Sequence, residues 1–248
     1  MYAKSALVKC KVCGLLYVSP RLTRESLVFH FNNHYLQAPE ALRWEQSRNK
    51  IYQQVLDVIK RFKKKQIFEI GCSYGTFLLM CQKAGLNVGG CEISSEACKS
   101  ASAHLGVRIL NGDVEEVGNL LEPQECVASI DTIYYCSDPQ HHLILIHKML
   151  RPGGILVLRV RNALYVELAT RLPWRTFPIE HLYFFTPRTL GDLLGKAGFG
   201  RWEIIPGVSH GIPRMVDLLV RSVAKLAMAI VGDGYILTRD FCTVAIKE

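Results

Sequence analysis

Several features that would place this 248-residue chain in a membrane or secreted class are missing from its sequence. No run of eighteen apolar residues free of charge occurs, so we expect no membrane span. The first residues show no secretory apolar core. The nine cysteines are scattered and do not form a recognisable disulfide framework. We therefore expect reduced, largely buried thiols and a cytoplasmic location.

A complete zinc site is lacking as well. Cys10-Lys11-Val12-Cys13-Gly14 has the spacing of half a zinc knuckle, in which two thiolates converge on one metal. No second Cys-x-x-Cys pair lies nearby, and His30 and His34 are weak candidates for the missing ligands. We predict that Cys10 and Cys13 are free thiols and that no metal is bound.

The aromatic residues that alternate with basic ones on nucleic-acid surfaces are also absent, although the net charge is +8. Part of that charge lies in the run Lys60-Arg61-Phe62-Lys63-Lys64-Lys65. A solvated helix end explains the run, since cations complement a helix C-terminus. An anionic substrate or surface is the alternative. We favour the helix end and expect no nucleic-acid partner.

The residues after this run predict a strand, a tight turn and a helix. Ile67–Ile70 is a short apolar segment typical of a strand covered on both faces. Gly71 and Gly75 bracket the turn, where glycine lets the backbone come close to a ligand. A dinucleotide site requires G-x-G-x-x-G, but Ser73 and Thr76 replace two of those glycines. Glu69 just before the turn suits a ligand with a positively charged end.

The stretch Glu69-Ile70-Gly71-Cys72-Ser73-Tyr74-Gly75 resembles motif I of the class I S-adenosylmethionine-dependent methyltransferases, Asp/Glu-x-Gly-x-Gly-x-Gly. Ser73 stands at the middle glycine, a position that a small residue can fill. Leu150-Arg151-Pro152-Gly153-Gly154 before an apolar strand is a second, independent match. The resemblance covers roughly residues 60–205. It implies a doubly wound, mostly parallel, seven-stranded Rossmann-like α/β sheet with an antiparallel last strand and a helical N-terminal region.

We divide the chain into an N-terminal segment, 1–60, and a cofactor-binding domain, 61–248. The N-terminal segment combines helices with a stretch that resembles the second half of a zinc ribbon. In the domain we expect a third strand over 107–110 and a fourth over 126–133. Near the end, a helix over 215–231 carries a polar stripe of Asp217, Arg221 and Lys225. We expect that helix to bury most of its circumference, through core packing or as a homodimer contact over 213–231. A lid over an apolar acceptor and a membrane-surface contact are the alternatives.

The resemblance implies that S-adenosylmethionine is the cofactor and assigns its contacts. Glu69 would hold the charged methionine end. Glu92, about twenty residues beyond the turn, can accept hydrogen bonds from ribose hydroxyls. An acid at Asp113 would meet the adenine amino group, although Asp113 also suits a helix N-cap. The predicted cofactor-binding residues are Glu69, Gly71, Cys72, Ser73, Tyr74, Gly75, Glu92, Ile93, Asp113, Val114 and Asp131.

Three residues are candidates for catalysis. Tyr134 and Tyr135 stand shortly before Asp138-Pro139, where many members of the resembled family carry Glu-His. His181 lies in a His-x-x-Phe-Phe-x-Pro pattern that resembles a subset of small-molecule methyltransferases, and it is our candidate for a base. Trp174 would complete the acceptor pocket. A purely structural role for His181 is the alternative, because a base is needed only if the acceptor must be deprotonated.

These patterns predict methyl transfer to a small-molecule oxygen, nitrogen or carbon, with catalysis mainly by orientation. Three alternatives stay open. A non-catalytic methyltransferase-like binding module fits the missing Glu-His pair. An NAD-dependent oxidoreductase is disfavoured by the missing glycines. An RNA methyltransferase would suit the basic charge, but no Asn-Pro-Pro-Tyr-type motif is present.

Overall fold

A seven-stranded sheet forms the centre of the computed structural model, which describes residues 5–33, 38–170, 181–208, 214–231, 236 and 238–248. Its order is β5-β4-β3-β6-β7-β10-β9. The first five are parallel and β10 is antiparallel to both neighbours. The strands are β3 (Gln66–Ile70), β4 (Asn87–Glu92), β5 (Leu110–Asn111), β6 (Gln124–Ile130), β7 (Leu150–Arg161), β9 (Arg201–Pro206) and β10 (Asp240–Ile246). The predicted doubly wound fold is confirmed.

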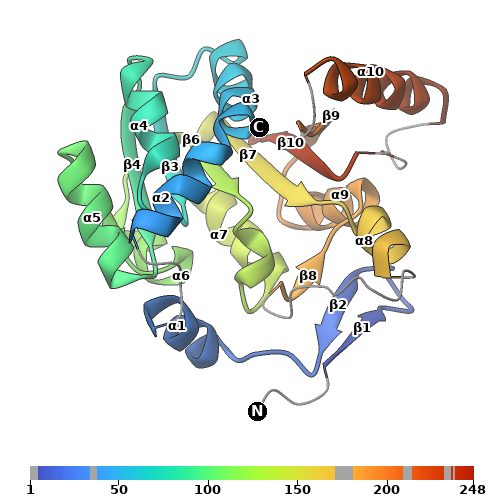
Figure 1. Ribbon diagram of the computed structural model, residues 1–248, viewed down its shortest axis with the longest axis horizontal. Coiled ribbons are helices and arrows are strands. Elements are labelled where there is room, and N and C mark those ends of the chain that lie inside the picture. Colours follow the sequence, from blue (N-terminus) through green and yellow to red (C-terminus); the bar gives the residue numbers. More distant parts are fainter. Residues whose placement is uncertain (1–4, 34–37, 171–180, 209–213, 232–235, 237) are drawn as a thin grey trace.

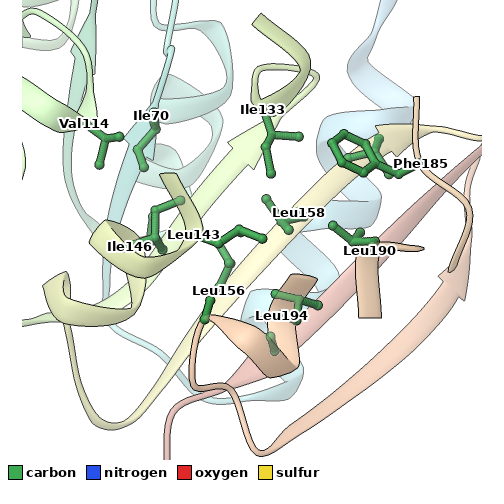
Figure 2. Packing of buried hydrophobic residues seen from close by; sticks show 14 of the residues in the cluster. Ile70, Val114, Ile133, Leu143, Ile146, Leu156, Leu158, Phe185, Leu190 and Leu194 are labelled. Carbon is green, nitrogen blue, oxygen red and sulfur yellow. The ribbon is translucent and has the colours of Figure 1, made fainter. Parts of the chain in front are cut away.

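Helices cover both faces of this sheet, as Figure 1 shows. On one face lie α3 (Asn49–Arg61), α4 (Thr76–Lys83) and α5 (Ser95–Leu105). On the other lie α6 (Val114–Val117), α7 (Pro139–Met149) and α9 (Pro187–Lys196). In β7, Leu156 and Leu158 face the second core, seen in Figure 2, while Ile155 and Val157 face the first. This alternation of apolar side chains explains why the strand is buried on both sides.

The N-terminal region adds a small second sheet and three helices. The hairpin β1 (Ala6–Lys9) and β2 (Leu16–Ser19) pairs through β2 with β8 (Tyr183–Phe184). The first two helices are α1 (Arg24–Asn33) and α2 (Ala38–Ser47). The third, α3, packs into the core of the seven-stranded sheet. The division of the chain at residue 60 therefore stays a proposal, since β2 and α3 both contact the later part of the chain.

Two predicted strands are shorter than expected. Only Leu110–Asn111 is a strand where 107–110 was expected, and β6 ends at Ile130 instead of residue 133. Asp131 has a φ of 56°, which turns the chain out of the strand. The short 3-10 helix η2 (Ile133–Tyr135) follows, while a second, η1 (Gly118–Leu120), precedes β6. The early end of β6 places Asp131 and η2 at the carboxyl edge of the sheet.

The last helix, α10 (Arg214–Val231), packs in the opposite way to our prediction. It lies on the outside of the molecule near β9 (Figure 1). Its polar residue Asp217 is buried and forms an ion pair with Arg221, 3.1 Å apart. Met215, Leu226 and Ile230 are exposed by 83%, 63% and 75%. The expectation that core packing covers most of this helix is therefore wrong.

The remaining helix, α8 (Ala163–Thr170), follows β7.

Candidate active site

A cavity opens at the carboxyl ends of the parallel strands, where ligands bind in open α/β sheets. It brings together side chains from β3, β4, β6, β7 and the N-terminal helices. Of the predicted site residues it is lined by Glu69, Gly71, Cys72, Ser73, Glu92, Ile93, Asp113, Val114, Asp131, Tyr134, Tyr135 and His181. Tyr74 and Gly75 are not part of its lining. Trp174 lies outside the described residues.

The turn after β3 takes a backbone shape that suits glycine. Gly71, Ser73 and Gly75 have φ angles of 71°, 49° and 83°. A Cβ on Gly71 would meet the Thr132 side chain at 2.6 Å, and one on Gly75 would meet Leu105 at 3.0 Å. Both glycines are thus required by packing within the protein as well as by φ. Close approach of a ligand is therefore not the sole reason for glycine at these positions. A larger residue at 71 would disturb the turn itself.

Glu92 fastens this turn to the end of β4. Its carboxylate accepts hydrogen bonds from the Ser73 N–H at 2.8 Å and the Ser94 N–H at 2.9 Å. Burial raises the pKa of Glu92, while these backbone donors oppose the rise. The carboxylate is therefore held at the cavity wall before any ligand arrives, as a pre-organised acceptor for hydroxyl groups.

Glu69 presents a buried carboxylate with spare capacity. Among the described residues its Oε2 has no hydrogen-bond partner, and burial raises its pKa well above the usual range. Glu45 and Glu92 raise that pKa further, while Arg48 lowers it. A buried hydrogen-bond acceptor without a partner costs free energy, so a cationic or hydrogen-bond-donating ligand group would stabilise the Glu69 carboxylate. The predicted methionine ammonium group fits that requirement.

A second buried acid, Glu45 of α2, was missed in the sequence. Its carboxylate accepts from the Tyr74 N–H at 3.2 Å and from the Thr76 hydroxyl at the start of α4. The residue is 1% exposed and lines the cavity. A carboxylate beside a helix N-terminus is favourable there. No local pattern marks Glu45, because it reaches the turn from 29 residues away.

Asp113 takes the helix N-cap role that its position suggested and also lines the cavity. It caps α6, accepting from the N–H groups of Glu115 and Glu116, in a capping box with Glu116. It also lies at the cavity wall and forms an ion pair with Arg24 of α1, 2.8 Å apart. Arg24, absent from the predicted site, thus ties the N-terminal helix to the end of the cavity where adenine was expected.

Tyr135 and His181 come together although 46 positions separate them. The Tyr135 hydroxyl lies 2.9 Å from Nε2 of His181, and the Tyr134 ring packs on the imidazole with centroids 4.2 Å apart. Burial, helped by Arg161, lowers the pKa of His181 to about 3. Within the described part of the chain Nδ1 has no hydrogen-bond partner. His181 is therefore a neutral imidazole with unused hydrogen-bonding capacity at the cavity.

Asp131 is held between two arginines, where we had predicted a contact with the cofactor. Arg48 and Arg159 both form ion pairs with its carboxylate, and Arg159 also binds Asp240 at 2.7 Å. These guanidinium groups lower the pKa of Asp131 against the opposing effect of burial. Asp131 still lines the cavity, but its main partners are protein cations. The arginines come from α3's N-terminal boundary and β7, so no local motif indicated them.

The Cys10–Cys13 pair lies between β1 and β2, on the second sheet. Both thiols are free. The Cys10 pKa is lowered, chiefly by backbone N–H groups that favour its thiolate. Across the described residues no group of three or more His, Cys, Asp or Glu side chains could hold a metal ion.

With this geometry in view, comparison with known proteins decides the family. A sequence profile for the "Methyltransferase domain" matches residues 43–203, more than half of the chain. The chain belongs to this methyltransferase family. The resemblance to class I S-adenosylmethionine-dependent methyltransferases, and the expectation of such an enzyme, are confirmed at the level of the family.

Relatives of this methyltransferase are distant. A ubiquinone biosynthesis O-methyltransferase from Psychrobacter arcticus is 26% identical over 158 residues, covering 57% of this chain and 61% of the relative. A possible histamine N-methyltransferase from Thermotoga maritima has a TM-score of 0.61 at 18% identity, covering 89% and 100% of the two chains. Phosphoethanolamine N-methyltransferase 2 of Haemonchus contortus, solved with S-adenosylmethionine, has a TM-score of 0.59 at 16% identity, covering 94% and 61%. The structural likenesses show the fold.

Proposed function

We propose that this methyltransferase transfers the methyl group of S-adenosylmethionine to a hydroxyl group of a small molecule. The observation that carries the proposal is the Tyr135–His181 pair on the same cavity as Glu69 and Glu92. S-adenosylmethionine, when bound, supplies a methyl group already activated on a sulfonium. The printed name of the distant relative, an O-methyltransferase, supports an oxygen acceptor.

Four residues of the chain fit the cofactor. The free Oε2 of Glu69 suits the positively charged methionine end. Glu92 is fixed by two backbone N–H groups and suits the ribose hydroxyls. Asp113 and Val114 lie at the cavity wall near α1, where adenine would contact Val114 and donate to Asp113. These assignments are supported by the donor and acceptor chemistry of each place.

His181 is the proposed base. Burial and Arg161 lower its pKa to about 3, so it is neutral at physiological pH and its Nε2 can accept a hydrogen bond, while its basicity in the empty cavity is weak. In the tautomer with hydrogen on Nδ1, Tyr135 donates its hydroxyl proton to Nε2. Tyr135 can then receive the acceptor's proton on its oxygen as its own passes to His181. The acceptor oxygen becomes nucleophilic while it is held beside the cofactor.

The test is turnover with isotopically labelled S-adenosylmethionine and a panel of catechols, phenols and primary amines, followed by mass spectrometry of the products. We expect an O-methyl ether from a hydroxyl-bearing probe. His181→Gln should lower kcat by about 100-fold, within the usual range for a proton-transfer residue, and leave cofactor affinity within about threefold. Methylation of nitrogen only, an unaffected His181→Gln variant, or no turnover across the panel would contradict the proposal.

We also propose that two copies pair through α10. Five of its exposed apolar residues recur at spacings of three and four, and β-branched residues alternate with leucine among them, as in two-stranded coiled coils. The seam is Val216, Leu219, Val223, Leu226 and Ile230, each at least 47% exposed. Leu219, Leu226 and Ile230 point away from the buried Asp217 and Ala224, while Val216 and Val223 lie about a quarter turn from them.

Sedimentation velocity tests this pairing. We expect a dimer at about micromolar concentration and a monomer for Leu226→Lys, because a charge would be buried in the seam. Ser222→Lys, on an exposed position beside the seam, is the matched control and should remain dimeric. A monomeric wild-type chain, or dimers of equal strength in all three proteins, would contradict α10 as the contact.

For the cell compartment we propose the cytoplasm. All nine cysteines are free, and Cys81, Cys91 and Cys126 are fully buried. Burial raises the pKa of these three thiols, which suits unreactive core thiols in a reducing compartment. No helix in the described ranges is long and apolar enough to cross a membrane.

A further inference from the structure

Arg161, the last residue of β7, lies on the cavity wall with incomplete pairing. Its nearest carboxylate oxygen is Oδ1 of Asp240, 3.8 Å from its Nε. Within the described residues neither that Nε nor that Oδ1 has a hydrogen-bond partner. Asp240 faces Arg161 across the β7–β10 pairing, but its other oxygen binds Arg159 at 2.7 Å. Among the described acids, Arg161 therefore has one neighbour, Asp240, at 3.8 Å and without a hydrogen bond to its Nε.

The charges of this cluster do not balance. It contains the guanidinium groups of Arg48, Arg159 and Arg161 and the carboxylates of Asp131 and Asp240. Counted over the described residues, three cations against two anions leave one positive charge in excess in this cluster. Arg48 and Arg159 share Asp131, so the excess lies on Arg161, whose side chain is 28% exposed toward the cavity it lines. A partly buried cation that shares its described counter-ion, Asp240, with Arg159 favours an additional anionic ligand.

Arg161 lies on the side of the cavity away from the glycine turn. β6 stands between β3 and β7 in the sheet, so about 10 Å separates the Gly71 turn from the strand that carries Arg161. Arg161 and His181 line the same cavity, and the positive charge of Arg161 lowers the pKa of His181. Arg48 is the cation that acts on Glu69 at the cofactor side. Arg161 therefore lies on the part of the cavity that also contains the Tyr135–His181 pair, where the acceptor is proposed to bind.

We propose that the methyl acceptor is a hydroxylated carboxylate, whose carboxylate binds the Arg161 guanidinium and so places its hydroxyl group at the Tyr135–His181 pair. This inference rests on the proposed function and names the substrate class of the same site. One excess positive charge matches the single charge of a carboxylate better than the two of a phosphate monoester. The planar guanidinium also suits a carboxylate geometrically.

The bound carboxylate would have a consequence for the base. Within the described parts of the chain, the charged groups acting on His181 are Arg161, which disfavours its protonation, and Asp131, which favours it. Tyr134 and Tyr135 of η2 pack on the ring. A carboxylate on Arg161 offsets the repulsion, so the pKa of His181 rises and its basicity increases. Only a charged acceptor would then strengthen the base.

The experiment uses protein loaded with S-adenosylhomocysteine and three probes: 3,4-dihydroxybenzoate, its methyl ester and catechol. Calorimetric titration should show the acid binding at least tenfold more tightly than the two uncharged probes. Arg161→Gln should abolish the difference, and Arg161→Lys should retain part of it. Arg188→Gln, an exposed arginine on α9, is the matched control and should behave like the wild type.

Each contrary outcome is distinct. Equal affinities for the acid and its ester in the wild type would overturn the inference without any variant, even if Arg161→Gln fails to fold. Tighter binding of phenyl phosphate than of the acid would overturn the choice of carboxylate. A selective loss of S-adenosylhomocysteine affinity in Arg161→Gln would assign Arg161 to the cofactor instead. Failure of the wild type to bind S-adenosylhomocysteine would count against the proposed function itself.

Discussion

The turn after β3 and the charged cluster at the ends of β6 and β7 line one cavity but are held by different interactions. The turn is fastened by hydrogen bonds between backbone N–H groups and Glu92, within about 20 positions of sequence. The cluster is fastened by ion pairs between Arg48, Asp131 and Arg159, up to 83 positions apart. The comparison teaches that the cofactor side can be read as a local motif, whereas the acceptor side exists only once the chain has folded.

Among the substitutions that distinguish the two regions, Asp131→Asn should have the largest effect, a loss of stability. Removing the carboxylate leaves Arg48 without its buried partner, so unfolding free energy should fall by about 3–5 kcal/mol in urea denaturation at pH 7. Glu203→Gln, which breaks the half-exposed pair with Arg61, is the control and should cost less than about 1 kcal/mol.

The same pair of variants predicts a pH dependence. Because the folded state holds the pKa of Asp131 below its usual value, its contribution is fully present above the ordinary aspartate range and is lost as the pH falls from that range through the lower pKa of the folded state. The difference in free energy of unfolding between the wild type and Asp131→Asn should therefore become smaller in acid. Equal stability losses for Asp131→Asn and Glu203→Gln would show that the cluster does not organise the acceptor side.

On the cofactor side, Glu92→Gln should weaken S-adenosylhomocysteine binding by about 2–3 kcal/mol, or roughly 30- to 150-fold. The neutral amide would lose one of the two acceptor oxygens that hold Ser73 and Ser94. Isothermal calorimetry measures the change, with the exposed Glu122→Gln as control. An unchanged affinity would place the ribose elsewhere.

A smaller effect should follow from the buried imidazole. Between about pH 6.5 and pH 4 the unfolded chain protonates His181 while the folded chain, with a pKa of about 3, does not. Stability therefore falls as the pH falls, at about 1 kcal/mol per unit from this residue. His181→Gln should flatten that slope in urea titrations. Burial also lowers the pKa of His142 to about 4, so His142 contributes the same pH dependence of stability in the wild type and in His181→Gln. Parallel slopes would show that His181 is accessible to protons.

Ser73→Gly should have the smallest effect on stability and on cofactor affinity. Glycine relieves the left-handed φ of 49° but adds flexibility to the unfolded chain, so stability should change by less than about 1 kcal/mol. Cofactor affinity should stay within about threefold, since the contact with Glu92 uses the backbone N–H. A large loss of binding would assign a role to the Ser73 hydroxyl.

The sequence contained enough to predict the sheet, the motif I turn and the acids Glu69, Glu92 and Asp113, because each follows a strand with a recognisable pattern. It did not reveal Glu45, Arg24 or Arg161. Each of these reaches the cavity from a separate element, and only tertiary packing decides its neighbours. The same limit explains α10: its stripe of Asp217 and Arg221 was visible, but periodicity does not say which face meets the protein.

The central claim, an adenosyl cofactor gripped between Gly71, Glu92 and Asp113, is tested most directly by titrating the folded wild-type protein with S-adenosylhomocysteine in a calorimeter. We expect one molecule bound per chain with a dissociation constant on the order of micromolar, equivalent to about 8 kcal/mol. No binding at hundredfold higher concentration, by protein that still unfolds cooperatively, would contradict the account.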